Sequence, residues 1–218
     1  MGCAKVPIGE CSDEALHWTY MLRTTKVRIA ILGSGAGSNA KALCSAARDS
    51  TTLFTVALVI STSAKAGICE VARGEGVELC VIPGDVKGEA FTELLGSLLN
   101  DHRIEVLVLA GFMRLLPPEI LRRMHGNVLN IRPALLPEFG GKGMYGIHVH
   151  EAVIAAHKVE SGATVHVVTE NYDEGAVVGQ MRIPVEATDS PLSLQEKVKV
   201  VEHQLYPAAV DQFIRTLR

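Results

Sequence analysis

Short aliphatic runs alternate with longer stretches at helical spacing along most of this chain, and this alternation constrains its fold more than any other feature. The aliphatic runs show little polar alternation, which is typical of parallel strands covered by helices on both faces. We expect strands at 27–32, 54–60, 77–82, 104–110 and 127–131, and helices at 38–48, 66–75, 88–100 and 118–124. The fold class is therefore predicted to be α/β: a single-domain, Rossmann-like, mainly parallel sheet flanked by helices.

The pattern changes after residue 145. A helix at about 149–158 is followed by two further strand-like segments at 163–170 and 176–185. These two segments are close together in the sequence, so we expect them to pair as an antiparallel C-terminal extension of the sheet.

The two ends of the chain differ in character. Ser190 followed by Pro191 is typical of a helix start, and we expect that last helix to end or kink at Pro207. Residues 1–26 mix charged and polar side chains without an apolar core. We interpret them as an N-terminal extension, disordered in part, and residues 27–218 as one domain.

Composition excludes several classes of function. The net charge is −3 and the sequence pI about 6.2, with lysine and arginine scattered, so nucleic acid is not an expected partner. The apolar runs are of strand length, too short to span a membrane. Five cysteines occur without a CxxC spacing, which favours free thiols and a cytoplasmic location. We expect small-molecule substrates and a monomer or homodimer.

A glycine-rich turn follows the first strand. Its sequence is GSGAGSN at 33–39, in which Gly37, Ser38 and Asn39 lead into the next helix. Free backbone N–H groups at such a helix start can hold an anion. The turn is neither a Walker loop nor a complete GxGxxG pattern. One interpretation is a monophosphate site; the other is a tight turn that only needs glycine.

A second candidate site follows the strand at 127–131. Asn130 and Arg132 are two residues apart, so on an extended chain their side chains share one face and could stabilise an oxyanion. The alternative is a strand that simply leaves the core. Asp173 stands in a turn between two strands, where it could face the same site or serve only as a turn residue.

Other polar residues have plain explanations. Glu202 and His203 stand in the middle of the last helix and would be solvated unless that helix covers the site. His148 and His150 are two apart but lack a third ligand at recognisable spacing, so we expect no metal.

Taken together, these motifs resemble the phosphoribosylglycinamide formyltransferase family. The similarity extends over roughly residues 27–217 and is carried by GSGAGSN, LAGFMRLL at 109–116, LNIRPALLP at 129–137, YDEGAVV at 172–178 and EHQLYP at 202–207. It implies a formyltransferase fold and transfer of the formyl group of 10-formyltetrahydrofolate to the amine of glycinamide ribonucleotide in purine synthesis. It also suggests a cis Leu136–Pro137 bond.

The resemblance assigns roles by position. The nucleotide phosphate would be bound by Gly37, Ser38 and Asn39, and the glycinamide end by Glu202. Asn130 and Asp173 would be catalytic. The folate would lie against Arg114, Leu115, Leu116, Val168, Tyr172 and Asp173.

The sequence departs from the family pattern at Arg132, where the family has histidine. A guanidinium supplies a permanent charge but cannot act as an acid or base near neutral pH. Loss of a general acid costs about 10²–10⁴ in rate, so we expect weakened rather than abolished catalysis. Two alternatives therefore stand beside the transferase: a poorly catalytic homologue that binds folate and nucleotide, and a formyltetrahydrofolate hydrolase. A family arginine that contacts the phosphate is also missing near residue 63, where Ser63 or Lys65 could replace it.

Overall fold

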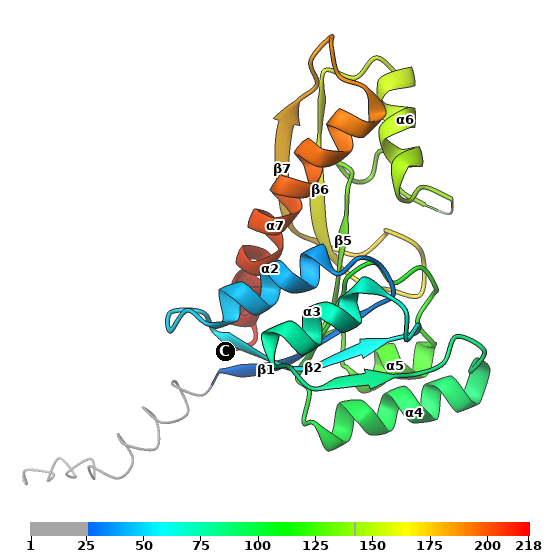
Figure 1. The fold of residues 1–218 in the computed structure, drawn as a ribbon, viewed down its shortest axis with the longest axis vertical. Helices are drawn as coiled ribbons and strands as arrows, with labels where there is room; N and C mark the ends of the chain where they lie inside the picture. Colours follow the sequence, from blue (N-terminus) through cyan, green and yellow to red (C-terminus); the bar gives the residue numbers. More distant parts are fainter. Residues whose placement is uncertain (1–25, 142) are drawn as a thin grey trace, which may run out of the picture.

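A seven-stranded sheet in the order β3-β2-β1-β4-β5-β6-β7 forms the centre of the protein (Figure 1). The computed structural model describes residues 26–141 and 143–218, so the expected disorder of the N-terminal extension lies outside the described residues. The first five strands along the chain are parallel and the last two antiparallel, which confirms the predicted fold class. The strands are β1 (Val27–Gly33), β2 (Phe54–Ser61), β3 (Leu79–Val81), β4 (Val106–Leu109), β5 (Val128–Arg132), β6 (Glu160–Val167) and β7 (Val177–Pro184).

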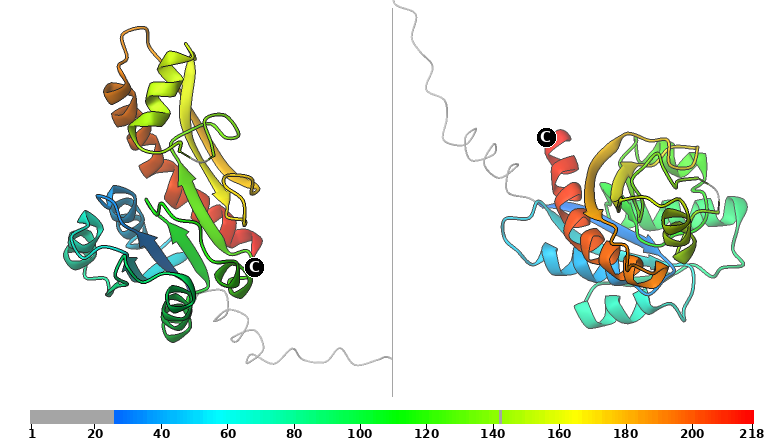
Figure 2. Two further views of the ribbon diagram at one scale, coloured as in Figure 1. Left: turned by 90° about the vertical axis from the view of Figure 1, so that its right-hand side faces the viewer. Right: turned by 90° about the horizontal axis from the view of Figure 1, so that it is seen from above.

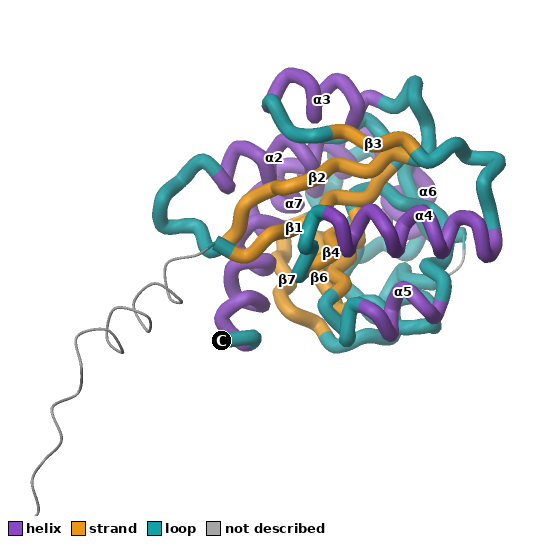
Figure 3. Tube along the Cα trace, turned by 90° about the horizontal axis from the view of Figure 1, so that it is seen from below, coloured by secondary structure: helices purple, strands orange, loops and turns teal. Residues whose placement is uncertain are grey.

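Helices cover both faces of the sheet. One face is covered by α2 (Ser38–Ala47), α3 (Gly67–Glu75) and α7 (Pro191–Thr216), and the other by α4 (Gly88–Asp101) and α5 (Pro118–Arg123). Figure 3 shows α2 and α3 on one side of β1 and β2, and α4 and α5 on the other. Successive β1 side chains alternate between the two cores, as strand geometry requires: Ile29 and Ile31 join the first, Ala30 and Leu32 the second.

Most elements lie where the sequence predicts them, with differences near the ends. The third strand covers only Leu79–Val81, at the edge of the sheet, where it has one partner strand. The expected helix at 149–158 is α6 (Ile147–Ala155). Helix α7 does not end at Pro207 but continues to Thr216. Buried residues on both sides of the proline, including Tyr206 and Ala209, hold it against the sheet, and their packing offsets the lost hydrogen bond.

Helix α7 also runs along β6 and β7, on the part of the sheet farthest from α4 and α5 (Figure 2). Strand order reverses between β1 and β4, and in open α/β sheets the carboxyl ends of such neighbours bound the ligand crevice. The chains approach closely there: a Cβ on Gly33 would lie 2.2 Å from the carbonyl oxygen of Ala110. Within the described residues, no helix combines the length and apolar character needed to cross a membrane.

Candidate active site

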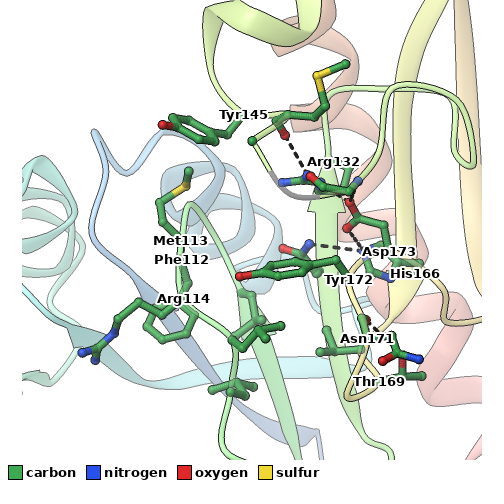
Figure 4. Close-up of a pocket in the computed structure, with 18 residues that line it drawn as sticks. Phe112, Met113, Arg114, Arg132, Tyr145, His166, Thr169, Asn171, Tyr172 and Asp173 are labelled. Atoms are coloured by element: carbon green, nitrogen blue, oxygen red, sulfur yellow. Dashed lines mark hydrogen bonds and ion pairs between the residues drawn. The ribbon is translucent and has the colours of Figure 1, made fainter. Parts of the chain in front are cut away.

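Two cavities flank the end of β5. The first, of about 470 Å³, is lined by Asn130 and Arg132 (Figure 4). The second, of about 360 Å³, is lined by Pro133, Ser38 and Glu202. Because Arg132 faces the first cavity and Pro133, the next residue, faces the second, the end of β5 stands between them. The two linings share no residue, and the neighbouring residues Arg132 and Pro133 line one cavity each.

Asn130 and Asp173 are brought together by a histidine that the sequence reasoning did not single out. His166 lies opposite Asn130 in the antiparallel β5–β6 pair. Its Nε2 atom is 3.2 Å from Nδ2 of Asn130 and 3.5 Å from Oδ1 of Asp173. The one signal for it was an ionisable residue inside an otherwise apolar strand. Its partner could not be read from the sequence, because strand register is a long-range property.

Burial lowers the pKa of His166. The carbonyl of Val167, 2.9 Å from Nδ1, and the charge of Asp173 oppose this effect, whereas the charge of Arg132 adds to it. The ring is therefore neutral at physiological pH.

Arg132 forms an ion pair with Asp173, at 2.9 Å from Nη2 to Oδ2. The same Nη2 atom donates to the carbonyl of Met144 at 2.7 Å and contacts that of Gly141 at 3.3 Å. Asp173 in turn accepts the N–H of Gly141 at 2.7 Å. Both side chains are largely buried, with 15% and 7% exposed. Arg132 thus places a fixed positive charge at the strand end and ties the loop after Gly140 to the site.

The residues expected to contact folate all line the first cavity. They are Arg114, Leu115, Leu116, Val168, Tyr172 and Asp173. The guanidinium of Arg114 lies over the ring of Phe91, 4.4 Å from its centre, and points away from the Asp173 cluster (Figure 4). The lining thus combines a polar group, Asn130, Arg132 and Asp173, with apolar side chains such as Leu115 and Leu116.

The second cavity is lined by Ala36 and Ser38 of the glycine-rich turn and by Glu202 from the middle of α7. Gly37 is the N-cap of α2 at φ 85°, and no side chain caps this helix start. Asn39 hydrogen-bonds Glu202, yet burial raises the pKa of Glu202 to about 7. Of the four residues expected at the nucleotide, Ser38 and Glu202 line this cavity, whereas Gly37 and Asn39 do not. Neither Ser63 nor Lys65 lines this cavity.

The two histidines of α6 do not form a pair. His150 is buried and lines the second cavity, whereas His148 is exposed and contacts Glu151. Residues two apart on a helix point in different directions, which explains the separation. In the described part of the chain, no group of three or more histidine, cysteine or acidic residues is arranged to hold a metal ion.

Tyr206 fixes the position of Glu202. Its hydroxyl, fully buried, donates to the carbonyl of Leu109 at 2.7 Å and lies 3.3 Å from that of Leu129. This contact ties α7 to the ends of β4 and β5. Glu202 lies one turn earlier on the same face of α7. The Tyr206 hydrogen bond therefore helps to hold Glu202 beside the second cavity.

Comparisons with known proteins identify the family of this chain. The sequence model of the formyl transferase family matches residues 27–210. A chloroplastic phosphoribosylglycinamide formyltransferase of Vigna unguiculata is 35% identical over 213 residues, 96% of this chain and 68% of that protein. Its Arabidopsis thaliana counterpart is 36% identical over 84% of this chain and 64% of that protein, so the chain spans about two thirds of these plant relatives. The crystal structure of glycinamide ribonucleotide transformylase 1 from Symbiobacterium toebii aligns with a TM-score of 0.81 and 32% identity, covering 88% of this chain and 89% of that one. The chain belongs to the formyl transferase family, and its relatives include phosphoribosylglycinamide formyltransferases.

Proposed function

We propose that the protein transfers the formyl group of 10-formyltetrahydrofolate to the amine of glycinamide ribonucleotide, a step of purine biosynthesis. The observation that supports this proposal is the pair of cavities on either side of the end of β5, one lined in part by apolar side chains and one beside a helix start without a side-chain cap. Residues 27–218 would form the catalytic domain. Both substrates are small molecules.

The nucleotide fits the second cavity. Its phosphate would lie on the N–H groups at the start of α2, around Gly37, Ser38 and Asn39, where the helix dipole favours negative charge. Glu202 would accept hydrogen bonds from the glycinamide end. The nucleophilic amine would then lie near Pro133, which lines the same cavity as Glu202.

The folate fits the first cavity. Its ring system would lie between the segment Arg114–Leu116 and the segment from Val168 to Asp173. The formyl group would then reach the polar end of the cavity, next to Asn130 and Arg132.

The chemistry follows from these positions. The amine nitrogen attacks the formyl carbon, a C–N bond forms, and the carbonyl oxygen becomes an oxyanion. The amide of Asn130 and the charge of Arg132 would stabilise that oxyanion, each donor contributing about 10²–10³ in rate. The tetrahedral intermediate then breaks its bond to N10 of the folate, and the amine proton is transferred to that nitrogen. Arg132 cannot carry this proton.

A spectrophotometric assay tests the proposal. The protein is mixed with 10-formyl-5,8-dideazafolate, and release of the deformylated product is followed by absorbance with and without glycinamide ribonucleotide. We expect turnover only with the nucleotide, and a formylated nucleotide product by mass spectrometry. Product release without nucleotide would instead identify a hydrolase. Binding of both ligands without turnover would identify a homologue that has lost catalysis.

Two further expectations stay predictions. One is a cytoplasmic location, although both plant relatives are described as chloroplastic. The other is the monomeric or homodimeric state.

A further inference from the structure

His166 has both ring nitrogens engaged, and the chemistry of its partners fixes which one carries the proton. The carbonyl of Val167 can only accept, so Nδ1, at 2.9 Å, must donate to it. In a neutral ring Nε2 then holds a lone pair. The amide nitrogen of Asn130, 3.2 Å away, donates to that lone pair. If the Asn130 amide were turned so that its oxygen faced Nε2, Nε2 would have to carry a proton as well as Nδ1. The imidazole would then be a buried cation.

We infer that His166 is a positioning residue for formyl transfer: its neutral Nε2 fixes the amide orientation of Asn130, and protonation of Nε2 releases it. This inference rests on the proposed function. It adds a role for a side chain that the resemblance to the family did not assign.

Protonation changes the hydrogen bonds around the ring. The new Nε2–H would face the Asn130 N–H and would instead bond to Asp173 Oδ1, now 3.5 Å away, or to the oxygen of a turned Asn130 amide. Either change moves the Asn130 N–H group that would donate a hydrogen bond to the oxyanion. Misplacement of a catalytic group by about 1 Å can cost about 10² in rate.

The charged groups that act on His166 are Asp173, from the loop after β6, and Arg132, from β5. Asp173 favours the protonated ring, and Arg132 and burial oppose it. Oδ2 of Asp173 pairs with Arg132, and the other carboxylate oxygen, Oδ1, is the one that faces His166. The site thus contains an ionisable imidazole beside the fixed charge of Arg132.

The kinetic test compares kcat at saturating concentrations of both substrates from pH 5 to 9. Wild type should lose activity on the acid side with an apparent pKa below the ordinary histidine value of 6.5. His166→Gln offers an acceptor oxygen that does not titrate, so it should keep kcat within about tenfold and lose the acid limb. His166→Ala has no acceptor and should lower kcat about 10²-fold at every pH. His125→Gln, an exposed histidine near the opposite end of the strands, should match wild type.

A second measurement does not depend on activity. The NMR titration of the His166 ring is recorded in wild type and in Asn130→Ala. Because the Asn130 donor stabilises the neutral ring, its removal should raise the pKa of His166. An unchanged pKa, or an acid limb that persists in His166→Gln, would overturn the inference. If wild type shows no formyl transfer at all, the proposed function fails, and the NMR titration still decides the contact.

Discussion

Replacing Glu202 with glutamine should stabilise the free protein above neutral pH and weaken its binding of nucleotide. Burial raises the pKa of this carboxyl from 4.5 to about 7. The folded state therefore holds the proton more tightly than the unfolded state. A raised carboxyl pKa lowers stability as pH rises between these two values, because only the unfolded chain ionises freely there.

The magnitude follows from the shift. At about 1.36 kcal/mol per pH unit, wild type should lose about 3 kcal/mol of unfolding free energy between pH 4.5 and pH 7, and nothing more above that range. Glutamine is neutral throughout. It can still bond to Asn39, so Glu202→Gln should match wild type near pH 4.5 and exceed it above pH 7. For a chain of this size 1 kcal/mol corresponds to about 2–4 °C, which predicts a Tm difference of about 6–12 °C.

Thermal unfolding followed by circular dichroism, at several pH values from 4.5 to 8.5 and without ligand, measures this difference. His150, His166 and His203 also titrate, but both proteins share them, so the comparison isolates Glu202. A Tm difference that does not change with pH would refute the argument. The same variant should raise KM for the nucleotide about 10–100-fold, since a hydrogen bond to a charged group contributes about 1.5–3 kcal/mol.

Three further substitutions test the rest of the site. Asn39→Leu should raise KM for the nucleotide and leave KM for the folate unchanged. Equal increases in both KM values would show that the phosphate does not bind at the start of α2. Arg132→Ala should lower kcat by about two orders of magnitude, because the fixed charge at the oxyanion is lost, and an unchanged kcat in steady-state assays would exclude Arg132 from catalysis. Tyr206→Phe should reduce the unfolding free energy by about 1–3 kcal/mol in urea titrations, because the carbonyl of Leu109 loses a buried donor; no loss would show that the contact does not anchor α7.

Local patterns were sufficient for much of the fold. The aliphatic runs give the parallel strands, because a strand covered on both faces must be apolar along its length. The glycine turn correctly marked the start of α2, since Gly37 takes a φ of 85° that other residues rarely adopt. The cis Leu136–Pro137 bond, suggested by family resemblance, is also present. Asn130 and Arg132 share a cavity as their spacing predicts.

Contacts between segments far apart in the sequence follow from the folded chain and not from local patterns. The partnership of Asn130 with His166 depends on the register of β5 against β6, which no local pattern encodes. Arg132 reaches Asp173 and two loop carbonyls only because the chain folds back after Gly140. Helix α7 passes through Pro207 because its neighbours are buried against the sheet. Which residues are apolar, turn-forming or ionisable can be read along the chain, because these are properties of single residues and of short periods. Packing across the sheet determined which ionisable groups meet, how deeply they are buried, and hence their charge.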